Sequence, residues 1–119
     1  MAHGDITHID IPVDDMERAT TFYGSVFGWQ IAEMPGYEGY PMWQGPNQIS
    51  GGGFTARSEN LQTMRSYVEV DSIDEVVART SGAGGSVVQP KTPISETSWF
   101  AVIADTEGNH LGLYEGITE

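Results

Sequence analysis

The chain has 119 residues, 39% of them hydrophobic and none of them cysteine, which suits one globular domain and excludes disulfides, thiolate nucleophiles and cysteine-ligated zinc. Seventeen acids against five bases give a net charge of −12, and such an acidic field repels phosphate backbones, so we expect no nucleic-acid partner. No apolar run reaches the ~20 residues that span a bilayer and no secretory signal is visible, so we expect no membrane partner and a cytoplasmic location.

The first predicted element is a strand in which apolar and polar residues alternate, the period-2 pattern of a half-buried sheet. Ile9, Ile11 and Val13 share one set of positions, and we expect them to face the helices. His8 and Asp10 occupy the other set, so their side chains are expected on the opposite, concave face of the sheet.

A helix follows this strand. Asp14 is expected to cap its N-terminus, with Glu17 as the capping-box partner, and Gly28 is expected to end it in a left-handed conformation. Six residues at helical spacing would face the sheet: Met16, Ala19, Thr20, Tyr23, Val26 and Phe27. Three further strands are predicted at about 29–34, 39–44 and 48–55. Turns are expected at 35–36 and 45–47, and the polar stretch 56–64 is expected to be a linker.

The second half of the chain repeats this order. At an offset of 57 residues, Val13–Ala19 aligns with Val70–Val76, matching Val to Val and Asp to Asp. Asp71 and Asp74 repeat the cap, and an apolar stripe again follows: Ile73, Val76, Val77 and Thr80. Three strands are predicted after the closing glycines, at about 86–90, 98–104 and 109–115, with a turn over 90–95.

Four segments together resemble a known family: Thr7–Asp14, Phe22–Trp29, Gly82–Gly85 and Asp105–Leu113. In this order they resemble the vicinal-oxygen-chelate superfamily, which includes glyoxalase I, bleomycin-resistance proteins, fosfomycin-resistance enzymes and extradiol dioxygenases. The chain is most similar to the glyoxalase-like, lactoylglutathione-lyase-related branch. The resemblance implies an α+β fold in a single domain (1–119), with two tandem βαβββ modules that form a curved eight-stranded mixed sheet, a half-barrel with a cleft. Module one would cover 5–55 and module two 65–117.

The family's enzymes hold a divalent metal with residues from the first and last strands of each module. By this resemblance His8 stands at the first ligand position, and it is the only ligand retained. The second position falls within 50–53, the third on Arg65 or Ser66, and the fourth on Gly112. Arginine offers no lone pair and glycine no side chain, and one histidine alone does not hold a metal. We therefore expect no metal and no other cofactor.

Strand parity sets several polar side chains on the concave face of the sheet. The strand arrangement that the resemblance implies would bring them together in a small-molecule site in the cleft between the modules, with aromatic walls. The expected lining residues are His8, Asp10, Arg65, Tyr67, Glu69, His110, Tyr114, Trp43 and Trp99. Arg65 could grip a carboxylate or phosphate of the ligand, or could instead form a structural ion pair with Asp10 or Glu69.

Three functions remain open from the sequence. The first is metal-independent binding of a small organic molecule, by a sequestering protein or an enzyme without a cofactor. The second is a metal-dependent lyase, isomerase or dioxygenase with a non-standard ligand set, made of His8 and His110 with Glu69 or Asp10. The third is a non-catalytic dimeric interaction module. Catalytic residues are not identified, and the resemblance implies a homodimer.

Overall fold

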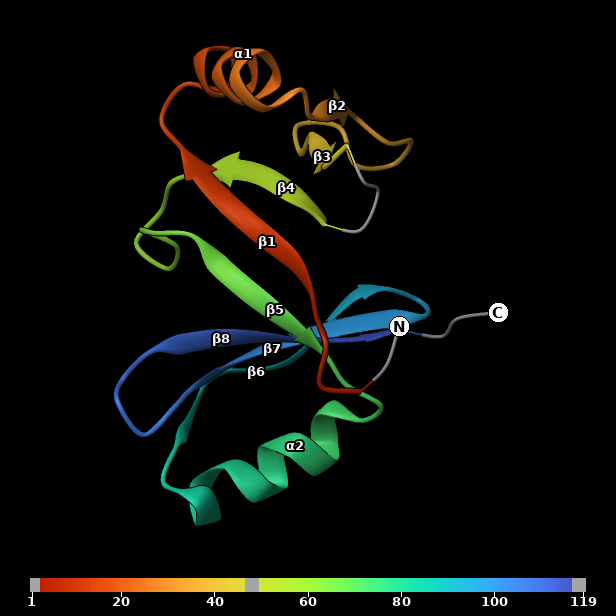
Figure 1. The fold of residues 1–119 in the computed structure, drawn as a ribbon. Helices are drawn as coiled ribbons and strands as arrows, with labels where there is room; N and C mark the ends of the chain where they lie inside the picture. The colour runs from red at the N-terminus through yellow and green to blue at the C-terminus, as the bar shows by residue number, and fades with distance from the viewer. Residues whose placement is uncertain (1–2, 47–49, 117–119) are drawn as a thin grey trace. The chain divides into compact units, whose positions relative to one another are not determined.

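The computed structural model describes residues 3–46 and 50–116. Two compact units make up the chain (Figure 1): a first unit, Thr7–Arg65, and a second unit, which combines Ser66–Glu119 with Met1–Ile6. Within the described residues, no helix is long and apolar enough to cross a membrane.

The described part of the first unit contains one helix and four strands. They run in the order β1 (Ile6–Val13), α1 (Met16–Phe27), β2 (Gln30–Ala32), β3 (Met42–Gln44) and β4 (Gly51–Ala56). In space the strands are ordered β2-β3-β4-β1. The β1 strand is parallel to β4, whereas β3 is antiparallel to both β2 and β4.

The second unit repeats this arrangement. Its elements are β5 (Arg65–Glu69), α2 (Ile73–Thr80), the short 3-10 helix η1 (Ser81–Ala83), β6 (Ser86–Ser95), β7 (Ser98–Ala104) and β8 (His110–Gly116). The spatial order is β5-β8-β7-β6, with β5 parallel to β8 and the other pairs antiparallel. The α+β class and the βαβββ order of each half are therefore confirmed.

Each helix begins one residue later than the sequence predicts. Asp15, not Asp14, is the N-cap of α1 and accepts a hydrogen bond from the backbone N–H of Arg18 at 3.0 Å. Asp14 lies outside the helix and pairs with Arg57. In α2 the cap is Ser72 rather than Asp71, because its hydroxyl reaches the N–H of Glu75. The predicted end of α1 is confirmed, since Gly28 has a φ of 72°.

Two strand predictions need correction. The turn expected over residues 90–95 is instead part of β6, and the chain turns at 96–97. The strand expected at 39–44 is shorter, because β3 begins only at Met42. Residues 47–49, which fall in the expected turn at 45–47 and the expected strand 48–55, lie outside the described residues, as does residue 117 of the predicted second module.

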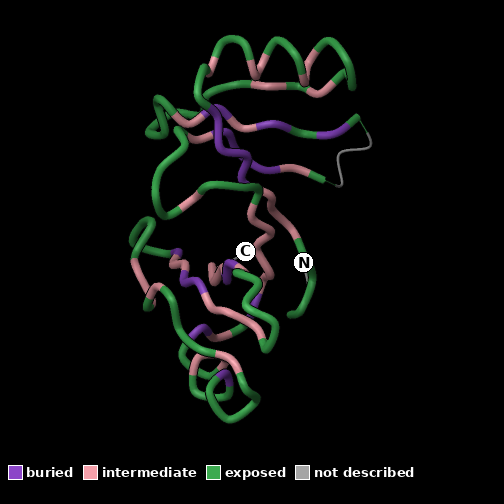
Figure 2. Tube along the Cα trace, turned by 90° about the vertical axis from the view of Figure 1, so that its left-hand side faces the viewer, coloured by how far each residue is buried: buried purple, intermediate pink, exposed green. Residues whose placement is uncertain are grey.

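Each unit has its own hydrophobic core on the face of its sheet that packs against its helix. Figure 2 shows that the buried segments lie mainly along the strands. The first core is built on Ile11, Val13, Trp43 and Phe54, and the second on Val70, Ile73, Ala101 and Leu113. The predicted inward direction of Ile11 and Val13 is thus confirmed.

The predicted apolar stripe of α1 is only partly buried. Met16, Ala19 and Tyr23 pack against the core, but Val26 and Phe27 are 55% and 50% exposed. Val26 comes ten residues after Met16. At ~100° per residue it points about 80° away from Met16 around the helix axis, which places it at the edge of the apolar stripe. Phe27 is the last residue of the helix, where no further turn covers its ring.

Candidate functional site

The face of the first sheet opposite the core carries polar side chains from β1. His8 and Asp10 alternate with the core-facing Ile9 and Ile11, which sets them on this second face. Asp10 is nearly buried, with a side chain 13% exposed, and the His8 side chain is 30% exposed. A small molecule on this face could therefore reach the imidazole, while the carboxylate is largely shielded.

Tyr40, from the loop between β2 and β3, joins these two residues in a hydrogen-bonded cluster. His8 Nε2 lies 2.7 Å from Asp10 Oδ1 and 2.8 Å from the Tyr40 hydroxyl. The Tyr40 hydroxyl also donates to Asp10 Oδ1. With the hydrogen of His8 on Nε2, one carboxylate oxygen of Asp10 accepts a hydrogen bond from both partners. We call this group the His8–Asp10–Tyr40 cluster.

Gly53 explains how Tyr40 reaches β1. In the register between β1 and β4, Gly53 stands opposite Asp10, and a Cβ at this position would overlap the Tyr40 ring. The missing side chain therefore leaves the space in which the tyrosine lies. Strand parity does not assign Tyr40 to this face, because Tyr40 belongs to an irregular loop. A glycine within a strand was the only sequence signal of its approach.

The second unit has a corresponding face on β5 and β8. Tyr67 stands opposite Gly112 and Glu69 opposite Tyr114, while the intervening Val68 points to the core. A Cβ at Gly112 would overlap the Tyr67 ring, so this glycine, like Gly53, is covered by a tyrosine. We call Tyr67, Glu69, Gly112 and Tyr114 the Glu69 face.

Glu69 supplies the carboxylate of this face. Its Oε1 atom is buried and has no hydrogen-bond partner among the described residues. Its backbone is fully engaged, since its N–H donates to the Asp5 carbonyl and its carbonyl accepts from Gly4. The strand at Glu69 is thus held in place while the side chain remains available.

Arg65 and His110 are both among the residues expected to line the cleft. Arg65 donates from Nη2 to the carbonyl of Asn60 at 2.7 Å, and no described ion pair joins it to Asp10 or Glu69. The expected structural ion pair is therefore wrong. His110 is the first residue of β8, beside the turn that precedes the strand, and is exposed.

Trp43 and Trp99 lie on the helix-facing sides of their sheets. Trp43 is 5% exposed in the first core and stacks on Trp29, with ring centroids 3.8 Å apart. Trp99 packs against the second core, and Lys91 Nζ lies 4.9 Å from its ring centroid. Core packing explains both rings, so we remove them from the candidate site.

The residues at the family's ligand positions do not fit a divalent metal. His8 Nε2 is already bonded to Asp10 and Tyr40, and Arg65 supplies no lone pair. Gly112 has no donor atom, and its free space is filled by Tyr67. Among the residues that the structure describes, no three His, Cys, Asp or Glu side chains are grouped to hold a metal ion.

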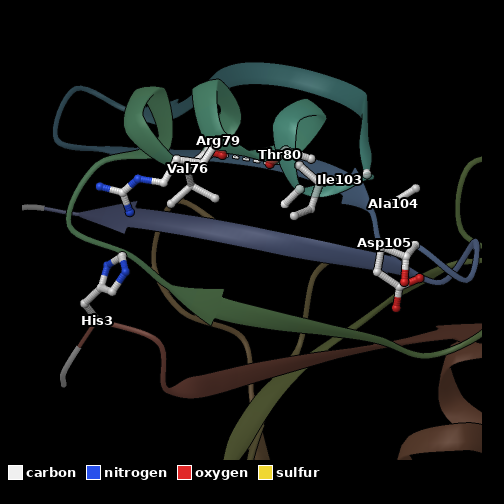
Figure 3. Close-up of a pocket in the computed structure, with 10 residues that line it drawn as sticks. His3, Val76, Arg79, Thr80, Ile103, Ala104 and Asp105 are labelled. Carbon is white, nitrogen blue, oxygen red and sulfur yellow. Dashed lines mark hydrogen bonds between the residues drawn. The ribbon is translucent and has the colours of Figure 1, made fainter.

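A separate hollow of about 430 Å³ lies in the second unit, against the C-terminal half of α2 (Figure 3). Its lining residues are His3, Val76, Arg79, Thr80, Ala83, Gly85, Ile103, Ala104, Asp105 and Thr106. In Figure 3 His3 and Arg79 lie at one end and Asp105 at the other. None of the residues predicted to bind a ligand lines this hollow.

Asp105 is held in the turn between β7 and β8. Backbone N–H groups of Asn109 and Glu107, with the Asn109 side-chain amide, donate to its carboxylate and lower its pKa from the ordinary value of 3.8. Hydrogen bonds that favour the charged form have this effect. The carboxylate thus stabilises its own turn and is not spare for a ligand.

Comparisons of sequence point to glyoxalase-like proteins. The family described as bleomycin resistance protein-like N-terminal matches residues 5–46. "Putative glyoxylase CFP32" of Mycobacterium bovis (strain ATCC BAA-935 / AF2122/97) is 26% identical over 90% of this chain and 44% of its own length. "Glyoxylase-like domain-containing protein" of Didymella fabae is 28% identical over 90% of both chains. The chain therefore spans less than half the length of the mycobacterial relative.

Solved structures share the fold at low sequence identity. Methylmalonyl-CoA epimerase from Mycobacterium tuberculosis is similar over 97% of this chain and 89% of its own, with a TM-score of 0.72 and 19% identity. "Hypothetical protein BH1468" from Bacillus halodurans C-125 is similar over 98% and 96%, with a TM-score of 0.71 and 15% identity. The family match, the glyoxalase-like relatives and this shared fold all point to the vicinal-oxygen-chelate superfamily, which confirms the resemblance seen in the sequence and supports a glyoxalase-like protein.

Proposed function

We propose that this glyoxalase-like protein binds a small organic molecule through the polar faces of its sheets, without the metal that the family's enzymes use. The observation that carries the proposal is the His8–Asp10–Tyr40 cluster, in which three polar side chains bond to one another on the face opposite the core. Ligand sites typically combine aromatic walls with a few well-placed polar groups.

The cluster supports binding because it is organised before any ligand arrives. Tyr40 is anchored over Gly53, and its hydroxyl and His8 Nε2 both contact Asp10 Oδ1. Side chains held by their neighbours lose little conformational entropy when a ligand binds. A ligand on this face would meet the edge of the imidazole and the tyrosine hydroxyl at fixed positions.

The donors that this chain offers support metal independence. A catalytic divalent site takes about three protein ligands and one open position. Here glycine and arginine stand at family ligand positions, and the nitrogen of His8 that faces the cluster is shared with Asp10 and Tyr40. The protein would therefore orient its ligand by hydrogen bonds and ring contacts.

The first test measures metal content and thermal stability of the full chain. Protein purified without chelators should contain well under one zinc, nickel or iron per chain by elemental analysis. Its melting temperature should rise with at least one of three aromatic probes, namely benzyl alcohol, benzoate and benzylammonium, and EDTA should leave that rise unchanged. Stoichiometric metal that is lost in His8→Ala would overturn the proposal and favour the metal-dependent enzyme.

The second test removes one hydroxyl from the cluster. Tyr40→Phe should weaken binding of the responding probe about fivefold, because a net hydrogen bond contributes about 1 kcal/mol. Tyr37→Phe is the matched control, since Tyr37 lies in the same loop and is exposed. Equal affinities of the two variants would remove the cluster from the binding site.

Two further parts of the proposal are a homodimer and a cytoplasmic location, neither of which the probe experiments address. Sedimentation velocity at micromolar concentration tests the first. A purely monomeric profile would contradict it without affecting the ligand site.

A further inference from the structure

The carboxylate of Glu69 is the starting point for an inference about the ligand's charge. Its Oε1 atom is buried without a hydrogen-bond partner among the described residues. Buried polar atoms in folded proteins nearly always have a partner, and a buried charged oxygen without one is especially unfavourable. An unpartnered carboxylate oxygen on a sheet face next to two tyrosines therefore indicates a missing donor.

No basic side chain of the described chain supplies that donor. Lys91 contacts Asp74 and Glu115, Arg79 contacts Glu75, and Arg57 contacts Asp14. Arg65 is bonded to a loop carbonyl. None of the described ion pairs includes Glu69, so an external cation is the natural partner of this carboxylate.

The surroundings of Glu69 also favour a cation. Tyr114 stands directly opposite on β8, and Tyr67 lies two residues before Glu69 on the same face of β5. Phe100 is paired with Tyr114 from the neighbouring strand β7, which extends the aromatic surface. Aromatic rings attract ammonium groups through their electron-rich faces. The net charge of −12 further raises the local concentration of cations.

We propose that the Glu69 face binds the protonated nitrogen of a small organic cation, with the carboxylate accepting its N–H and the tyrosine rings flanking it. This inference rests on the proposed function and adds the chemical class of the ligand, a small aromatic or aliphatic ammonium compound. Gly112 contributes by leaving room for Tyr67 to lie beside Glu69.

The inference is tested by isothermal titration calorimetry of the full chain at low salt, with three probes of similar shape. Benzylammonium carries a cation, benzyl alcohol is its neutral counterpart and benzoate is an anion. Benzylammonium should bind at least tenfold more tightly than the other two. Benzyltrimethylammonium, which cannot donate a hydrogen bond, should bind more weakly than benzylammonium, because it retains only the contact with the rings.

Glu69→Gln keeps the shape of the side chain and removes its charge. It should weaken benzylammonium binding about tenfold or more, as expected for a hydrogen bond to a charged group. It should leave benzyl alcohol binding within twofold. It should not lower the melting temperature, because Oε1 has no hydrogen-bond partner among the described residues. Glu59→Gln is the matched control, since Glu59 is exposed in the segment between β4 and β5.

The outcomes separate this inference from the proposed function. If benzyl alcohol or benzoate binds and depends on Tyr40, while benzylammonium has no advantage or is unaffected by Glu69→Gln, the cation inference fails and the proposed function stands. If none of the probes binds, both fail. A fall in melting temperature for Glu69→Gln, with benzylammonium affinity unchanged, would assign Glu69 a structural role and overturn the inference.

Discussion

Replacing Gly112 by alanine should destabilise the protein through a single side chain, Tyr67. A Cβ at Gly112 would lie closer to the Tyr67 ring than the 3.0 Å that real Cβ atoms keep, so the ring must move. Without this overlap, alanine in a strand would give a more stable protein than glycine, because it lowers the conformational entropy of the unfolded chain. We expect the overpacking to dominate and to cost about 1–3 kcal/mol, or roughly 4–12 °C in melting temperature for a chain of this size.

A double-mutant cycle tests this effect, with urea unfolding monitored by tryptophan fluorescence. Tyr67→Ala alone loses ring contacts, but in its background Gly112→Ala should become neutral or slightly stabilising, which gives a coupling of about 1 kcal/mol or more. Gly82→Ala is the control, because a Cβ there meets open space without a left-handed φ. Its effect should stay within about 1 kcal/mol. A Gly112→Ala protein as stable as wild type, or one equally destabilised without Tyr67, would refute the reasoning.

Three other perturbations have defined outcomes. Asp15→Ala should lower the free energy of unfolding by about 1 kcal/mol, because it removes the N-cap of α1. Asp14→Ala should lower it by less, because it removes only an exposed ion pair with Arg57, and urea titration compares the two variants. Ile73→Ala should cost about 2–5 kcal/mol in the same assay, because Ile73 is fully buried in the second core. Asp105→Asn should lower the melting temperature at neutral pH. Because the folded pKa of Asp105 is lowered, its stabilisation is present above pH 3.8 and is lost as the pH falls further, so calorimetry should find the two proteins converging in acid.

The sequence predicts those features that depend on local periodicity. Alternation along β1 correctly separates Ile11 and Val13 from His8 and Asp10, because adjacent residues of a strand point to opposite faces. The repeat correctly predicts the second βαβββ unit. The helix caps are displaced by one residue, since two neighbouring polar residues at each start could serve and only backbone geometry selects between them.

Features that depend on tertiary position are missed. Pro90 and Pro93 suggested a turn, yet both lie in β6, which tolerates proline because β6 is the last strand in the order β5-β8-β7-β6. Tyr40 enters the site from a loop without periodicity, so no pattern could place it beside His8. Glu69 Oε1 lacks a hydrogen-bond partner because of where the donors of the described chain lie, and composition does not reveal those positions.

The hydrogen bonds between the start of the chain and Glu69 affect how this protein can be divided. Gly4 and Asp5 satisfy both backbone groups of a residue more than sixty positions later, so they complete the second unit although they precede the first. A fragment beginning at Ser66 would lack this one donor and this one acceptor at the strand that carries Glu69. Split-protein or domain-shuffling work should therefore transfer the leading peptide together with the C-terminal half, for example by circular permutation.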